Sequence, residues 1–109
     1  MDEQELSLTP NQEIILSALR FQRRYGLEIM AAIEQSGGKQ IGFNSLYPNL
    51  KKLEKKGFVQ SEWGDESPEE HTGARRKYYR ITGTGEQALA AKQRLLENVA
   101  RWMPAPEGI

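Results

Sequence analysis

The chain has 109 residues, contains no cysteine, and carries 15 basic and 15 acidic side chains, which give it a formal net charge of zero. This length predicts one domain with a modest core, and the lack of thiols excludes disulfides and thiolate metal sites. No apolar run approaches the roughly 18 residues of a membrane span, and the acidic N-terminus lacks a signal-peptide pattern, so we expect a cytoplasmic protein.

Charge is nevertheless sorted along the chain. Four lysines and one glutamate lie between Lys51 and Lys56, and four basic residues without an acid lie between Arg75 and Arg80. An acidic stretch separates the two clusters. Binding depends on the local field rather than on the total charge, so a neutral chain can still carry basic surfaces. The alternative interpretation is that both clusters are ordinary solvated faces.

The N-terminal part of the chain predicts two helices. Thr9 is expected as the N-cap of the first, with Pro10 at the first helical position and Gln12 completing a capping box. A second helix is expected from about residue 25 to residue 36, where a pair of glycines ends it. In the connector that follows, Ile41 is a candidate for a brief strand.

The segment NSLYPNLKKLEKKGF predicts a third helix with two unlike faces. At 100° per residue, Leu46, Leu50 and Leu53 cluster within about 60° of each other. With Ser45 as the expected N-cap, Pro48 would lie at the third helical position, where its missing N–H has no intrahelical partner. The opposite face carries Asn44, Pro48, Lys51, Lys52 and Lys55.

After the third helix, apolar residues recur at every second position, as they do in β-strands. Residues 58–63 and 77–81 read as strands, and the polar, turn-forming segment between them predicts a hairpin with a long tip. Alternation places Tyr79 and Ile81 on one face of the second strand, and Tyr78 with two arginines on the other. One of the two tyrosines is therefore expected in the core.

A last helix is expected from residue 83 to residue 103, with Thr82 as its cap. Its apolar stripe, about 140° wide, would leave large apolar side chains exposed on a monomer. We therefore expect a homodimer that forms through this helix, mainly through the half toward Val99 and Trp102. The candidate dimerisation residues, with a lysine at the edge of the stripe, are Leu89, Lys92, Leu95, Leu96, Val99, Trp102 and Met103.

Three helices followed by a two-stranded hairpin are the plan of a winged helix-turn-helix domain. The expected fold class is mainly α with a small β-hairpin, divided into a flexible acidic N-terminus (1–8), the winged domain (9–82), a C-terminal dimerisation helix (83–103) and a tail (104–109). In this plan the third helix enters the DNA major groove, which is about 12 Å wide, and the hairpin is the wing. Taken alone, the third helix would read as an ordinary surface helix, but the second basic cluster, ARRKYYR, favours a DNA-binding function.

The candidate DNA-binding residues come from the second helix start, the third helix and the wing. They are Tyr25, Asn44, Ser45, Tyr47, Pro48, Asn49, Lys51, Lys52, Lys55, Arg75, Arg76, Lys77 and Tyr78. Tyr25 and the wing side chains are expected to contact phosphates. Ser45, Asn49 and Lys52, near the start of the third helix, are expected to face base edges.

The sequence contains few residues in a pattern that would indicate a catalytic or cofactor-binding site. The segment Gly83-Thr84-Gly85-Glu86-Gln87-Ala88 fits the pattern G-x-G-x-x-A, but no later segment reads as the second strand that a dinucleotide site needs. We interpret these glycines as serving a tight strand-to-helix turn. His71 and the pair Glu69-Glu70 lie in the polar hairpin tip, with no apolar pocket to activate them. We therefore expect no enzyme, no metal site and no cofactor.

Three separated motifs resemble those of PadR-type transcriptional regulators. They are Tyr25-Gly26-Leu27-Glu28-Ile29 in the second helix, Ser45-Leu46-Tyr47-Pro48 with Leu50-Lys51-Lys52-Leu53-Glu54 and Gly57-Phe58-Val59 in and after the third, and Arg76-Lys77-Tyr78-Tyr79 with Ile81-Thr82 and Gly85 at the wing. The likeness covers about residues 12 to 90 and departs at Asn44, where the family commonly has glycine. The single C-terminal helix resembles the compact branch of the family.

The resemblance implies a homodimeric winged-helix repressor that dimerises through its C-terminal helix and is often released by a small molecule. In the compact branch a flat aromatic effector can stack in the dimer cleft. Trp102 either lines such a cleft or, as we favour, packs in the dimer interface. The branch also includes a clock-associated regulator, so a second interpretation stays open, in which the chain is a protein-interaction module whose DNA binding is secondary or lost.

Overall fold

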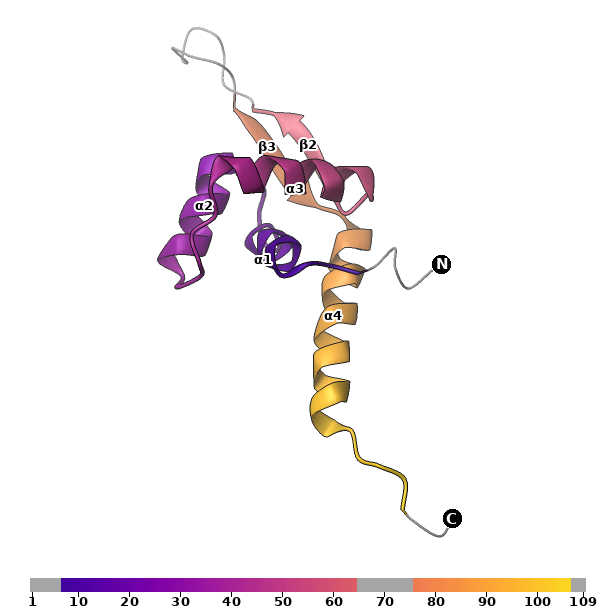
Figure 1. The fold of residues 1–109 in the computed structure, drawn as a ribbon. Coiled ribbons are helices and arrows are strands. Elements are labelled where there is room, and N and C mark those ends of the chain that lie inside the picture. Colours follow the sequence, from indigo (N-terminus) through magenta and orange to yellow (C-terminus); the bar gives the residue numbers. More distant parts are fainter. Residues whose placement is uncertain (1–6, 65–75, 107–109) are drawn as a thin grey trace, which may run out of the picture.

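The computed structural model describes residues 7–64 and 76–106. The elements follow in the order α1 (Pro10–Ala18), β1 (Arg24–Tyr25), α2 (Gly26–Gln35), α3 (Phe43–Lys55), β2 (Val59–Trp63), β3 (Lys77–Ile81) and α4 (Gly83–Arg101). Three helices and a small antiparallel sheet form the body of the molecule, and α4 extends away from it (Figure 1). The predicted class, mainly α with a small hairpin, is confirmed. None of the described helices is long and apolar enough to cross a membrane.

The start of α1 is the predicted capping box. The Gln12 backbone N–H donates to Thr9 Oγ1 at 3.2 Å, and the Thr9 N–H donates to Gln12 Oε1 at 3.1 Å. These reciprocal bonds satisfy two amides at the helix start. Leu8, just before the cap, is buried and belongs to the core. The folded domain therefore begins before Thr9, which corrects the boundary expected after residue 8.

The sheet has a third strand that the sequence pattern did not predict. Its order is β1-β3-β2, with β1 antiparallel to β3 and Tyr25 opposite Tyr78. The expected brief strand at Ile41 is wrong, because this residue lies in irregular backbone and contributes only a buried side chain. A strand of two residues shows no period, so only its pairing with β3 reveals it.

α3 starts earlier than predicted. Its N-cap is Gly42 rather than Ser45, so Pro48 lies at the sixth helical position instead of the third. The additional turn carries Phe43, whose ring stacks on that of Tyr47 with centroids 5.8 Å apart and planes 8° apart. An aromatic pair at this i, i+4 spacing stabilises a helical turn. The C-terminal end agrees with the prediction, because Gly57 follows the helix with φ of 80°.

The core lies between α1, α2, α3, the sheet and the first turns of α4. The leucine face of α3 is fully inside it, since Leu46, Leu50 and Leu53 are each at most 1% exposed. Tyr79 of β3 is buried as well, so it is the tyrosine of the pair that joins the core. The other members of the core cluster are Leu8, Ile15, Leu16, Leu19, Ile29, Ile33, Ile41, Phe58, Val59, Ala88 and Leu89.

The turn from β3 into α4 explains the second glycine of the G-x-G-x-x-A segment. Thr82 caps α4, and its Oγ1 accepts a hydrogen bond from the Gly85 N–H at 3.0 Å. A Cβ on Gly85 would overlap the Phe58 carbonyl oxygen and would lie 2.8 Å from Ile81 Cγ1, whereas a Cβ on Gly83 would meet open space. Gly85 is therefore required for close packing, as the structural interpretation of this motif expected.

The two glycines make a matched pair for a stability test. Gly85→Ala should lower the free energy of unfolding by about 2 kcal/mol, because the added methyl overpacks against backbone. Gly83→Ala should leave it unchanged or raise it by about 0.5 kcal/mol, because alanine restricts the unfolded chain. Urea unfolding at one fixed protein concentration measures both, and equal effects of the two substitutions would contradict this packing.

Candidate nucleic-acid interface

The outward face of α3 is polar, exposed and positively charged. Asn44, Tyr47, Pro48, Lys51, Lys52 and Lys55 all have exposed side chains. In residues 7–64 and 76–106 none of these three lysines forms an ion pair. The one acid of the helix, Glu54, turns toward the sheet, where its Oε2 accepts a hydrogen bond from Ser61 Oγ at 2.6 Å. The lysine face, formed by Lys51, Lys52 and Lys55, is therefore not neutralised by ion pairs in the part of the chain that the structure describes.

Two of the three residues expected to read bases lie on the flank of α3 that faces α1. Ser45 and Asn49 are half-buried, while Lys52 is exposed. Asn11 Nδ2 donates to Ser45 Oγ at 3.3 Å, and Asn49 Nδ2 donates to the Ser45 carbonyl oxygen at 2.9 Å. These bonds hold α3 against α1 and reinforce its own backbone. Base reading by Ser45 and Asn49 stays a prediction, but they do not share the exposed face with Lys52.

Tyr47 is placed by a glycine of the neighbouring helix. Its hydroxyl occupies the space that a side chain on Gly26, the first residue of α2, would need. The Tyr47 side chain is 43% exposed, so one edge packs on α2 while the other reaches solvent. Tyr79 is close to Tyr47. The pKa of the Tyr79 hydroxyl is raised above its usual value, mainly because the side chain is buried and to a smaller extent because Tyr47 and Glu54 are near.

The base of the wing carries a cluster of aromatic rings and guanidinium groups. Tyr25 and Tyr78 meet edge to face, with centroids 5.5 Å apart. The Arg76 guanidinium carbon lies 4.8 Å from the Tyr25 ring centroid, and that of Arg23 lies 4.3 Å from the Tyr78 ring. Cation–π contacts of this kind hold the arginines close to the rings. Tyr25 and Tyr78 are half-buried, so part of each side chain remains at the surface.

Arg23 was not predicted as part of this site. It lies just before β1, and only the pairing of β1 with β3 brings it beside the wing. Its partner Glu62 accepts from Arg80 at 2.7 Å and lies 3.3 Å from Arg23. The hydrogen bond from Arg80, supported by Arg23, holds the pKa of the Glu62 carboxyl below its usual value. The carboxylate therefore stays charged and compensates part of the basic charge at the sheet.

Two of the three basic wing candidates lie within the described residues. Arg76 and Lys77 are exposed, and the Lys77 Nζ lies 5.9 Å from the ring centroids of both Trp63 and Tyr79. Arg75 lies outside the described residues, as do the tip acids and His71.

α4 presents an apolar surface that the body does not cover. We use this name for Leu95, Leu96, Val99, Trp102 and Met103, which are all more than half exposed. Lys92 is half-buried at its edge. Leu89 is only 2% exposed, so it is a core residue of the monomer, which corrects its expected place in the dimer surface. The helix ends at Arg101, so Met103 lies beyond it rather than on its last turn.

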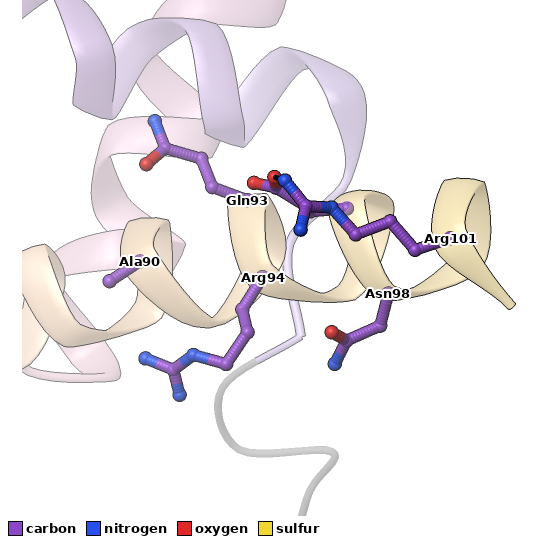
Figure 2. A pocket seen from close by; sticks show the side chains of 6 residues that line it. Ala90, Gln93, Arg94, Asn98 and Arg101 are labelled. Atoms are coloured by element: carbon purple, nitrogen blue, oxygen red, sulfur yellow. Dashed lines mark ion pairs between the residues drawn. The ribbon is translucent and has the colours of Figure 1, made fainter.

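The other face of α4 is polar. A shallow hollow there is lined by Ala90, Gln93, Arg94, Glu97, Asn98 and Arg101. Figure 2 shows the labelled side chains, those of Ala90, Gln93, Arg94, Asn98 and Arg101, projecting from the one helix. Arg101 forms an ion pair with Glu97 at 2.7 Å, one turn earlier. A pairing surface on α4 would therefore use the apolar face.

Three helices, a wing and an exposed lysine-bearing third helix define a winged helix-turn-helix protein. Residues 15–91 match the model of the transcriptional regulator PadR-like family. The chain belongs to this family, whose members are transcriptional regulators rather than enzymes, as the sequence led us to expect.

Known relatives cover most of the chain. An uncharacterized protein of Lysinibacillus sphaericus is 36% identical over 96 residues, which are 86% of this chain and 79% of that protein. A PadR-family regulator from Eggerthella lenta superposes with a TM-score of 0.69 at 30% identity, over 83% of this chain and 74% of its own. The structure of Bacillus subtilis PadR in complex with operator DNA superposes with a TM-score of 0.67, over 94% of this chain and 54% of the PadR chain. The two sequences are 24% identical, so this comparison supports a common fold and nothing further.

Pro48 lies inside α3, where it removes one backbone hydrogen bond of the helix. Pro48→Ala should raise the free energy of unfolding by about 1 kcal/mol, because alanine supplies the N–H that the Asn44 carbonyl lacks, and this gain exceeds the added freedom of the unfolded chain. Lys51→Ala, on the same exposed face, should change it by less than about 0.5 kcal/mol. Urea unfolding followed by circular dichroism measures both; a less stable Pro48→Ala protein would contradict this view of the helix.

Proposed function

We propose that the protein is a cytoplasmic repressor that binds a two-fold symmetric operator as a homodimer. α3 enters the major groove, and the wing lies along the phosphate backbone. The observation that carries this proposal is the lysine face of α3, which is exposed and uncompensated among the described residues. Lysines in such a position neutralise phosphates and release counterions. The likeness of the fold to a PadR protein solved with operator DNA is consistent with this docking.

The apolar surface of α4 supports the homodimer. Val99 and Trp102 are 66% and 70% exposed, and contiguous apolar patches of this kind are uncommon on monomers in water. A C2 dimer would bury the same surface on both chains. Pairing also places two α3 helices on one DNA, which increases the effective concentration of the second helix after the first has bound.

The dimer can be tested with one charge on either face of α4. Leu96→Asp or Val99→Asp should give monomers in analytical ultracentrifugation at micromolar concentration, because the charge would be buried unpaired. Both should also lose tight DNA binding. Asn98→Asp adds the same charge on the polar face and should keep the dimer and the affinity. A wild-type protein that sediments as a monomer at micromolar concentration would refute the proposed assembly.

Positioning and reading of DNA can be separated with two lysines. Lys77→Ala on the wing should weaken binding to all duplexes about equally and lower the slope of affinity against salt by roughly one for each subunit of the dimer. Lys52→Ala on α3 should cost about 1–3 kcal/mol for each half-site of the operator and relax the base preference at one position of each half-site. Binding selections on randomised duplexes, run at several salt concentrations, measure both effects.

The same selection tests the whole proposal. The wild type should return a mirrored motif with half-site centres roughly one helical turn, or a multiple of it, apart. If Lys77→Ala changes the base preference while Lys52→Ala does not, the roles of helix and wing are assigned wrongly. A wild type that enriches no motif, and that does not shift the DNA upstream of its own gene in a gel, would favour the protein-interaction module instead.

A further inference from the structure

α3 is divided along its length as well as around its axis. Residues 43–49, FNSLYPN, carry no charge, whereas residues 51–56 carry four lysines. In helix-turn-helix proteins the N-terminal residues of the recognition helix contact base edges. The first half of α3, which the proposed docking brings to the bases ahead of Lys52, is therefore neutral, and its exposed members are Phe43, Asn44, Tyr47 and Pro48.

Phe43 is the least expected of these residues. It is the first residue of α3 and its side chain is 52% exposed, so the core does not require it. It also lies apart from the apolar surface of α4. α4 begins against Phe58, just past the other end of α3, and runs away from the body (Figure 1). The proposed dimer contact therefore does not explain why a phenylalanine is exposed here.

The ring of Phe43 has a fixed support. It stacks nearly parallel on Tyr47, with centroids 5.8 Å apart, and Tyr47 is itself packed against Gly26 of α2. An aromatic side chain has two rotatable bonds, so a stacked ring loses little further entropy when it binds. The pair thus forms a preorganised apolar plate at the reading end of the helix.

We propose that Phe43, supported by Tyr47, recognises thymine by its methyl group in the major groove. This inference rests on the proposed docking of α3. The C5-methyl of thymine is the apolar group that a base pair presents in this groove, and phenylalanine is among the side chains that contact it. A phenyl ring neither donates nor accepts a conventional hydrogen bond, so Phe43 discriminates between bases by methyl contact alone.

The test removes only that methyl group. In the duplex selected by the wild type, symmetric pairs of thymines near the start of α3 are replaced by deoxyuridine, which pairs identically but lacks the methyl. Burial of one methyl is worth about fourfold in affinity. At one symmetric pair, wild-type affinity should therefore fall about 15-fold for the two half-sites together.

The variants identify the residue that reads the methyl. Phe43→Ala should bind the thymine and deoxyuridine duplexes equally well, whereas Tyr47→Phe, which keeps the ring pair, should preserve the wild-type ratio. Phe21→Ala is the matched control, since Phe21 is an exposed phenylalanine in the loop between α1 and β1, and it should preserve the ratio too. Circular dichroism establishes that each variant is folded.

The possible failures are distinguishable. If the wild type selects no duplex, the proposed function fails and this inference fails with it. If the wild type binds a mirrored motif but deoxyuridine changes its affinity at no thymine, the inference is overturned while the function stands, and this outcome needs no variant. If Phe43→Ala weakens both duplexes by the same factor, Phe43 only stiffens the start of α3, and the inference is again overturned.

Discussion

The packing of three leucines determines which side chains of α3 face solvent and can contact a ligand. Leu46, Leu50 and Leu53 are almost completely buried and lie on one side of the helix. Burying each such side chain contributes about 2 kcal/mol, so rotation of α3 by even one residue would expose several kcal/mol of apolar surface. The orientation of the helix about its axis is therefore fixed by the core. The lysines point outward as a consequence, without needing any ion pair to hold them there.

A neutral chain can carry a positive face where the acids near that face have other partners, as three of the described acids do. Glu54 accepts a hydrogen bond from Ser61, Glu62 pairs with Arg80 and Arg23, and Glu97 pairs with Arg101. These contacts place negative charge on the sheet and on the far part of α4. The field at the lysine face is then set mainly by the charges of α3 itself, three lysines against the one Glu54, since screening limits the reach of more distant charges to about 10 Å at 0.1 M salt. The total charge of the chain is a poor guide to its partner.

The elements that could be predicted are those with a local signature. The capping box at Thr9, the leucine period of α3 and the glycine after it, and the alternation around Tyr79 each involve residues a few positions apart. Each reflects hydrogen bonding or burial within one element, so the pattern is visible in the sequence.

The features that were missed depend on contacts between distant residues. β1 has two residues and is defined by its pairing with β3, which also brings Arg23 to the wing. The early start of α3 follows no strong N-cap and is supported by the ring stack of Phe43 on Tyr47. The Ser45 hydroxyl, expected to cap α3, instead accepts a hydrogen bond from Asn11 of α1, and the cap lies at Gly42. In the candidate site, exposure of the lysines could be predicted, whereas the packing of the flanks could not.

The junction between the winged domain and α4 has a consequence for the proposed dimer. Thr82 Oγ1 donates to the Gly57 carbonyl oxygen at 2.6 Å, the Thr82 N–H donates to the Phe58 carbonyl oxygen at 3.0 Å, and Gly85 packs against that same carbonyl. Gly57 and Phe58 follow the C-cap of α3, Lys56, so α4 is bonded to the segment that ends α3 rather than joined to it by a loose linker. In a dimer formed through α4, a change in the angle between the two α4 helices would therefore rotate both α3 helices with it. Because the spacing of half-sites on B-DNA is set by the helical repeat, such a rotation would change operator affinity without altering any residue that touches DNA.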